Sequence, residues 1–354
     1  MIMTTVNEYY SDPKFPGITS ESRVLLGALD FKDVYLIPQY TEVTSRSQVS
    51  TAIELGGIKL DIPVISANMD TVTESLMASE MRAGGAIGAI HRFMSIERNV
   101  EIFKETSARC FVSVGVNDES RLRADALHHA GARYFIVDIA HGHSKMMKDM
   151  IMWLRATYED IFIMGGNVAT TAGVLDLVDW GCDAVKVGIG PGAVCTTKNV
   201  TGVTIPQLSA VLDCASALTD YRIRRRSEKQ IYLVADGGIT EIGDIAKCLA
   251  AGADLVMSGR LFASATEAPG ARVHGQKVYR GMASRDAMLT VREEKSLPTA
   301  EGITTLLDEP ERSVELILKD IKGGLQSSFS YSNARNLVEF REKAVFGIRR
   351  TSMK

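Results

Sequence analysis

Short apolar runs alternate with longer stretches of helical periodicity along most of this chain. Runs rich in β-branched and aliphatic residues predict eight strands, at 62–69, 86–91, 110–116, 134–140, 161–168, 184–190, 231–239 and 255–262. Apolar positions at helical spacing predict helices between them, among others at 72–83, 95–106 and 241–251. Most strands start about 24 residues after the preceding one, which is the length of one strand, one helix and two short loops. The pattern is that of repeated strand–helix units.

Eight such units within roughly 200 residues predict a TIM (β/α)8 barrel. A doubly wound open sheet is the alternative, and the regular spacing favours the barrel. One interval, between the sixth and seventh strands, is about twice as long as the others. It opens with the glycine-rich stretch GIGPGAVCTTKNVTG. Long loops in compact folds are usually functional, so the interval is a candidate site.

The remaining segments are expected to complete one domain that covers residues 1–354. Residues 1–60 precede the barrel and predict a hairpin or cap around LDFKDVYLIPQY. Residues 263–354 follow it and return to helical periodicity near 311–326 and 333–344. No low-complexity linker separates these segments from the barrel strands at about 62–262.

Composition narrows the class of protein. The 354 residues are 45% hydrophobic with a formal net charge of −3, which is typical of a globular protein and gives no reason to expect nucleic acid as a partner. No uncharged apolar run is long enough to predict a membrane span, and no secretory signal is apparent. Five cysteines without CxxC spacing favour reduced thiols in a cytoplasm. One basic run is interpreted as a solvated loop: Arg222, Arg224, Arg225, Arg226 and Lys229.

Polar residues and glycines recur where the predicted strands end, as expected at the functional rim of a barrel. They are Asn68-Met69-Asp70, His91, Asp138, Asn167, Asp236-Gly237-Gly238 and Gly259-Arg260. Glycines after the seventh and eighth strands favour phosphate binding through backbone N–H groups, and Arg260 adds a positive charge. Asp236 is a candidate acceptor for ribose hydroxyls, with a turn or capping role as its alternative.

Cys195 lies in the glycine-rich loop at the same rim, beside Thr196 and Thr197. That setting makes it a candidate nucleophile, whereas the other four cysteines fall within strand or helix patterns and are expected to be packing residues. The backbone carbonyls of Gly190, Gly192 and Cys195 are candidate ligands for a monovalent cation such as potassium. A metal at Asp138-x-x-His141-x-His143 is less favoured than contact with a cofactor or substrate. No GxGxxG follows the first strand, so a nicotinamide cofactor would bind in another way.

Long segments of the chain resemble the IMP dehydrogenase/GMP reductase family, which is a family of TIM barrels. The resemblance runs from about residue 28 to about 346 and includes ISANMDTVTES, IGAIHRFMSIERN, DIAHGHS, GGNVAT, VGIGPGAVCTTKNVTGVTIPQLSAV, ADGGITEIGDIAKCLAAGAD and YRGMAS. It implies that Cys195 attacks C2 of a purine nucleoside monophosphate to form a covalent thioimidate. The dehydrogenase oxidises IMP to XMP with NAD, and the reductase converts GMP to IMP and ammonia with NADPH.

The resemblance also implies roles for individual residues. Thr197 would position or protonate the leaving group or water. The implied substrate-binding residues are Met69, Asn167, Asp236, Gly237, Gly238, Gly259, Arg260, Tyr279, Gly281, Met282, Ser284 and Glu301. Among these, Asp236 would hold the ribose, and Gly238 and Gly259 would hold the phosphate. Met282 and Glu301 would hold the purine base. The implied cofactor-binding residues are Asp138, Ile139, Ala140 and Arg285. The family commonly forms homotetramers.

Three features favour the reductase over the dehydrogenase. The chain lacks the CBS modules that dehydrogenases usually insert after the second strand–helix unit. The expected active-site flap, at about 281–302, has no Arg-Tyr pair between Ser284 and Glu301 to activate water. CTTKNVTG and SSFSYSNA also look more like the reductase pattern, although HGHS and MSIERN look more like dehydrogenases.

The chain departs from the family pattern in three places. Arg285 and then Asp286 follow GMAS, where a glutamate is expected, so Asp286 is the predicted acid that assists ammonia departure. Ala193 stands in place of a serine that contacts phosphate, and Arg260 in place of serine or glycine. Arg260 is interpreted as compensation for the lost hydroxyl, with a different nucleoside monophosphate as the alternative. A dehydrogenase without CBS modules and a catalytically inactive nucleotide-binding regulator remain as alternatives, and the C-terminal segment 303–354 carries no assigned chemistry.

Overall fold

Eight parallel strands close into a barrel in the computed structural model, which describes residues 28–106, 109–225, 230–290, 297–308 and 311–349. Each strand pairs with the next in sequence, and β11 pairs with β4 to complete the circle. The TIM barrel predicted from strand spacing is therefore confirmed. The strands are β4 (Val64–Ser66), β5 (Ile87–Ile90), β6 (Phe111–Val114), β7 (Tyr134–Asp138), β8 (Phe162–Val168), β9 (Ala184–Val187), β10 (Tyr232–Asp236) and β11 (Leu255–Ser258).

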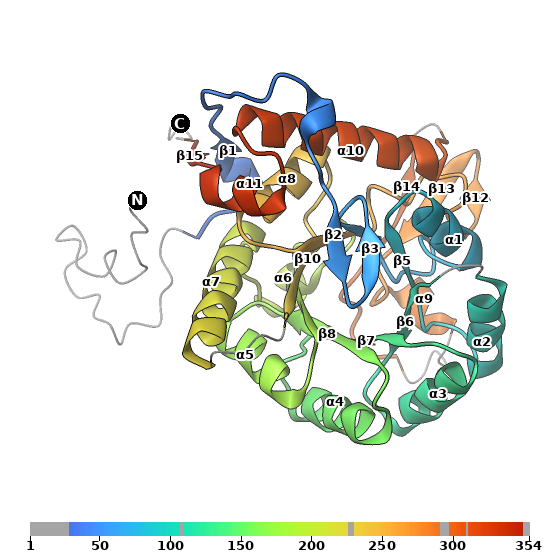
Figure 1. Cartoon of the computed structure of the whole chain (residues 1–354). Helices are drawn as coiled ribbons and strands as arrows, with labels where there is room; N and C mark the ends of the chain where they lie inside the picture. The colour runs from blue at the N-terminus through green and yellow to red at the C-terminus, as the bar shows by residue number, and fades with distance from the viewer. Residues whose placement is uncertain (1–27, 107–108, 226–229, 291–296, 309–310, 350–354) are drawn as a thin grey trace.

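Helices follow the barrel strands and form an outer ring (Figure 1). Ser95, Asn117, Ser144 and Thr170 each cap the helix they precede by accepting a backbone N–H, the arrangement that fixes helix starts. The predicted helices are confirmed with boundary shifts of a few residues. The ring comprises α1 (Ser75–Ala83), α2 (Ile96–Glu105), α3 (Asp118–His129), α4 (Lys145–Thr157), α5 (Thr171–Trp180), α7 (Gln207–Arg225) and α8 (Ile242–Ala250).

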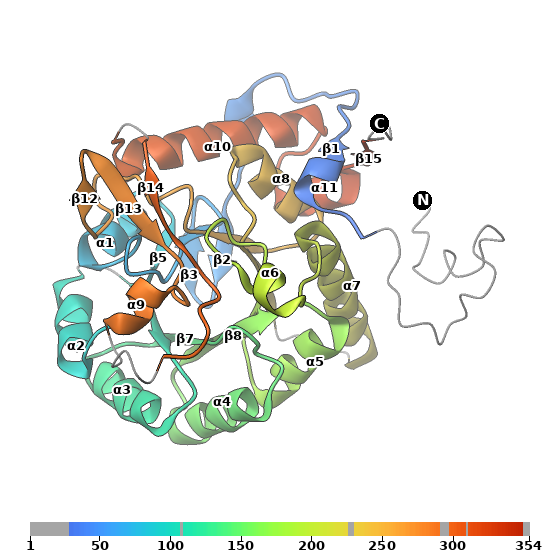
Figure 2. The same cartoon turned by 180° about the vertical axis from the view of Figure 1, so that it is seen from behind.

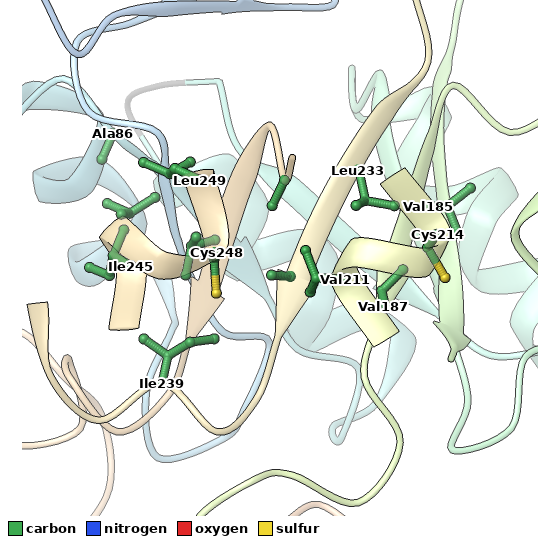
Figure 3. Close-up of a cluster of buried hydrophobic side chains, with 14 of the residues drawn as sticks. Ala86, Val185, Val187, Val211, Cys214, Leu233, Ile239, Ile245, Cys248 and Leu249 are labelled. Carbon is green, nitrogen blue, oxygen red and sulfur yellow. The ribbon is translucent and has the colours of Figure 1, made fainter. Parts of the chain in front are cut away.

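Side chains alternate between two hydrophobic clusters because successive residues of a strand face opposite sides. In β11, Leu255 and Met257 face the barrel interior, whereas Val256 packs outward against the helices. Figure 3 shows part of the outer cluster, where Leu249 and Cys248 of α8 and Cys214 of α7 pack beside the strands. This two-sided burial explains why the strands are almost continuously apolar in sequence.

A hairpin of β2 (Ile53–Leu55) and β3 (Ile58–Leu60) closes one end of the barrel (Figure 1). Leu55, Ile58 and Leu60 belong to the inner cluster, together with Phe111. The sequence prediction of a hairpin or cap around residues 29–40 is wrong in position. That segment forms a short 3₁₀ helix, η2 (Phe31–Asp33), and β1 (Val34–Leu36), which pairs with β15 (Phe346–Ile348) near the other end of the chain. A second 3₁₀ helix, η3 (Arg46–Gln48), lies between β1 and the hairpin.

The long interval between β9 and β10 holds a loop, the short helix α6 (Thr197–Thr201) and α7. The basic run predicted to be a loop is partly helical, because α7 extends to Arg225 and includes Arg222 and Arg224. Arg226 and Lys229 lie outside the described residues.

The segment after the barrel forms an antiparallel sheet of β12 (Arg272–Val273), β13 (Gln276–Arg280) and β14 (Thr304–Leu307). With α9 (Arg285–Leu289), this sheet lies over the end of the barrel that α6 also covers (Figure 2). Two helices complete the chain, α10 (Val314–Tyr331) and α11 (Leu337–Lys343). Across the described ranges, no helix has the length and apolar composition that a bilayer span requires.

Candidate active site

A cavity of about 490 Å³ opens at the carboxyl ends of the barrel strands, opposite the β2–β3 hairpin. A cavity of this size is within the range of small-molecule sites. Of the residues assigned to catalysis or to substrate, cofactor or cation binding, all but three line it, whereas the rim residues Asp70 and His91 do not. Those that do are Met69, Asp138, Ile139, Ala140, Asn167, Gly190, Gly192, Cys195, Thr197, Asp236, Gly237, Gly238, Gly259, Arg260, Tyr279, Gly281, Met282 and Glu301.

Cys195 begins a short hydrogen-bonded chain in this cavity. Its Sγ donates to Thr197 Oγ1 at 3.2 Å, and Thr197 Oγ1 donates to Glu301 Oε2 at 2.8 Å. The chain joins a thiol to a carboxylate through one hydroxyl, so it provides a path for the thiol proton.

The backbone holds this arrangement in place, although Cys195 and Glu301 are far apart in sequence. The amide of Thr196 donates to the carbonyl of Glu301 at 2.8 Å, and the amide of Glu301 donates to the carbonyl of Ala283 at 3.0 Å. The Cys195 loop and the flap therefore meet through main-chain contacts that do not depend on their side chains.

The other four cysteines are buried, as predicted, and only Cys195 among the five is partly exposed. Burial raises the pKa of both Cys110 and Cys214 to about 12, and it raises the pKa of Cys248 well above its ordinary value. A buried protonated thiol is a poor nucleophile, so Cys195 is the candidate for nucleophilic chemistry.

The structure does not bring Asp286, the predicted acid, into this chain of hydrogen bonds. Asp286 is exposed on α9, accepts a hydrogen bond from Thr304 Oγ1 at 2.6 Å, and does not line the cavity. Glu301, assigned from sequence only to the purine base, occupies the position beside Thr197. The exposed Arg285 and the buried Ser284 also do not line the cavity; Ser284 instead caps α9 by accepting the amide of Ala287 at 3.2 Å.

Glycines shape the opposite wall of the cavity. Gly237 and Gly238 have φ of 93° and 75°, which favours glycine, and a Cβ on Gly237 would lie 2.9 Å from Pro191 Cγ. A Cβ on Gly259 would lie 2.6 Å from Met69 Sδ and 2.8 Å from Tyr279 Oη. Arg260 follows on the same wall. This backbone surface with an adjacent guanidinium has the chemistry of a phosphate site.

Sequence reasoning missed Lys186, which projects from β9 into the cavity. Its Nζ lies 2.8 Å from Asp138 Oδ1 and 2.6 Å from Asp236 Oδ2, and it also donates to Asn167 Oδ1. The available signal was a lysine inside a strand whose neighbours are all apolar, since an unpaired charge is rarely buried.

The histidines after β7 do not assemble a metal site. His143, in the loop before α4, has its Nε2 2.8 Å from Asp176 Oδ2 of α5, and His141 is exposed. Within the described part of the chain, no group of three or more His, Cys, Asp or Glu side chains is arranged to hold a metal ion.

The fold and site are those of a barrel enzyme: a (β/α)8 barrel with a partly exposed cysteine at the carboxyl ends of its strands and a glycine-lined cavity wall beside it. The family model described as "IMP dehydrogenase / GMP reductase domain" matches residues 28–353, and the chain belongs to this family.

Individual relatives carry both names of the family. The chain is 36% identical to GMP reductase of Chromobacterium violaceum, over 89% of this chain and 96% of the relative. It is 37% identical to GMP reductase of Streptococcus equi subsp. equi, over 88% and 92%. It is 35% identical to inosine-5'-monophosphate dehydrogenase of Aquifex aeolicus, over 93% of this chain and 69% of the relative.

Proposed function

We propose that this protein is a GMP reductase, which converts GMP to IMP and ammonia with NADPH through a covalent intermediate on Cys195. The observation that carries the proposal is the hydrogen-bonded chain from Cys195 through Thr197 to Glu301. Reductive deamination needs a group that accepts the thiol proton and returns a proton to the departing amine, and a carboxylate at the end of a hydroxyl relay does both.

The first step follows from these contacts. As Cys195 Sγ bonds to C2 of the purine, the C2=N3 double bond opens and its electron pair moves to N3; the thiol proton passes to Thr197 Oγ1 while the Thr197 proton passes to Glu301 Oε2. The same path then runs in reverse: Glu301 returns its proton through Thr197 to the amine at C2, the C2=N3 bond re-forms, and the C2–N bond to the amine breaks to release ammonia. NADPH, when bound, would supply the hydride for C2, after which the C2–S bond breaks with its electron pair on sulfur and leaves Cys195 as the thiolate.

The nucleotide would lie along the glycine wall. Asp236 lines the cavity and would accept ribose hydroxyls, and Gly238 and Gly259 line it as well, where their backbone N–H groups would bind the phosphate. Ala193 contributes no hydroxyl there, and Arg260 supplies a charge in its place. The cofactor would occupy the end of the cavity at Asp138, Ile139 and Ala140, where Arg92 and Phe93 also line the wall.

The named relatives support the reductase, because two proteins named GMP reductase are 36% and 37% identical to this chain over 96% and 92% of their own length. The flap sequence between Ser284 and Glu301 also lacks an Arg-Tyr pair to activate water for hydrolysis. The candidate substitutes, Arg292, Glu293 and Glu294, lie outside the described residues.

Three further properties belong to the proposal. A monovalent cation such as potassium would bind the carbonyls of Gly190, Gly192 and Cys195; the Gly192 carbonyl accepts the Cys195 amide at 3.0 Å and keeps a second lone pair for an ion. The protein would act as a homotetramer, and it would act in the cytoplasm on small-molecule substrates.

The deciding experiment offers the purified protein two substrate pairs. GMP with NADPH should cause loss of absorbance at 340 nm with equimolar release of ammonia and IMP. Steady formation of XMP and NADH from IMP and NAD would instead establish a dehydrogenase. Tight nucleotide binding without turnover of either pair would establish an inactive regulator.

A further inference from the structure

We infer that Lys186 is a positioning residue that couples the two ends of the cavity, by holding Asp236 at the nucleotide end and Asp138 at the cofactor end with a single ammonium group. The identities of the two ligands rest on the proposed function. The coupling itself rests on contacts within the chain.

The ammonium of Lys186 is fully engaged. It has three N–H donors, and its three acceptors are Asp138 Oδ1, Asp236 Oδ2 and Asn167 Oδ1. The residue is only 2% exposed. Because Asp138 ends β7 and Asp236 ends β10, the ammonium of β9 bridges parts of the barrel rim that belong to different ligand sites.

Two asparagines fix the carboxylates on either side. Asn68 Nδ2 donates to Asp138 Oδ2 at 3.1 Å. Asn167 Nδ2 donates to Asp236 Oδ2 at 3.0 Å and to the carbonyl of Gly188 at 2.6 Å. With both carboxylates oriented in this way, the one ammonium holds both of them in place at once.

Electrostatics keeps Lys186 and Asp138 charged. Burial alone would lower the pKa of Lys186, but the carboxylates of Asp138 and Asp236 raise it above its ordinary value. Burial alone would raise the pKa of Asp138, but Lys186 and then Arg92 hold it below its ordinary value. On the nucleotide side, Tyr279 interacts with Asp236 and Arg260, and burial raises the pKa of Tyr279 so that it stays neutral. At neutral pH Lys186 therefore exchanges no proton, and its effect is on geometry and charge.

Removal of the ammonium leaves two carboxylates facing each other in a site of low dielectric. Like charges at short range strongly raise the pKa of one of the two carboxylates. The protonated carboxyl would lose acceptor capacity toward its ligand, and the unclamped side chains would lose their orientation. A single substitution of Lys186 should thus damage both binding sites.

The test measures binding of GMP and of NADP⁺ by calorimetry from pH 5.5 to 8.5. Asp236→Asn should weaken the affinity for GMP by about tenfold or more and change the affinity for NADP⁺ by no more than about threefold. Asp138→Asn should weaken the affinity for NADP⁺ by about tenfold or more and change that for GMP by no more than about threefold. Lys186→Met should weaken both affinities by about tenfold or more and should make both depend on pH below about pH 7. Lys186→Arg should restore the flat pH profile, because it retains the charge. Lys247→Met, at a lysine that does not line the cavity, should change neither affinity.

Loss of only one affinity in Lys186→Met, or loss of both with a flat pH profile, would overturn the coupling. If Lys186→Met does not fold, the Lys186→Arg variant tests the coupling instead. The different geometry of its guanidinium should still weaken the affinity for both ligands. A wild-type chain that binds IMP and NAD⁺ but not GMP and NADP⁺ would overturn the proposed reductase function but not the coupling. The affinities of the variants would then be measured for IMP and NAD⁺.

Discussion

Replacement of Glu301 by glutamine tests the proton path most directly. Glutamine has nearly the same shape, and the main-chain contacts of residue 301 with Thr196 and Ala283 do not involve the side chain. The carboxamide can still hydrogen-bond to Thr197, now 2.8 Å from Glu301 Oε2, but it cannot store a proton. A positioned acid–base group contributes about 10²–10⁴-fold to rate, so kcat for GMP should fall by that factor, about 3–5 kcal/mol, with KM changed only a few-fold.

The assay follows NADPH oxidation at 340 nm and ammonia release in parallel, from pH 5.5 to 9. In Glu301→Gln, ammonia release should become the slow step. Asp286→Asn is the matched control on the same flap: because Asp286 is exposed and bonded to Thr304, its kcat should stay within about threefold of wild type. A Glu301→Gln enzyme with near-normal kcat, beside a severely impaired Asp286→Asn enzyme, would refute the assignment.

Three further predictions follow from the same geometry. Cys195→Ser should lose nearly all turnover but retain GMP binding by calorimetry, because a hydroxyl is a far weaker nucleophile than a thiolate; near-normal kcat would contradict the covalent mechanism. Arg260→Ala should raise KM for GMP by about 10- to 150-fold and leave KM for NADPH nearly unchanged, because a lost charge-assisted contact costs ~1.5–3 kcal/mol. Equal increases in both KM values would mean that Arg260 does not contact the phosphate. Because Asp138 has a lowered pKa in the folded chain, it stabilises the fold above its unfolded pKa of about 3.9, and this stabilisation is lost as pH falls through the folded value; urea unfolding of Asp138→Asn should therefore depend less on pH below about 4 than that of wild type.

The sequence by itself determined the barrel and most of its rim. Strand and helix patterns are local, so the repeat of about 24 residues is visible without knowledge of any contact. Once a barrel is assumed, its geometry brings the carboxyl ends of all strands together, and this is why Cys195, Asp236 and Gly259 were correctly assigned to one cavity.

Tertiary structure decided which acidic residue lies beside Thr197. Asp286 was favoured because it follows the GMAS segment closely in sequence. The flap, however, begins α9 at a Ser284 cap, which leaves Asp286 on the exposed side, and the chain then returns so that Glu301 hydrogen-bonds to Thr196 and Thr197. That pairing spans more than a hundred positions and leaves no periodic signal.

Lys186 was overlooked for a similar reason. A single lysine in an apolar strand is explained only by its partners, and those come from β7, β8 and β10. The energy of a buried charge depends on opposite charges within a few ångströms, which the fold supplies and the local sequence does not record. Local patterns therefore determined where the site is, whereas long-range contacts determined which groups in it share a proton or a charge.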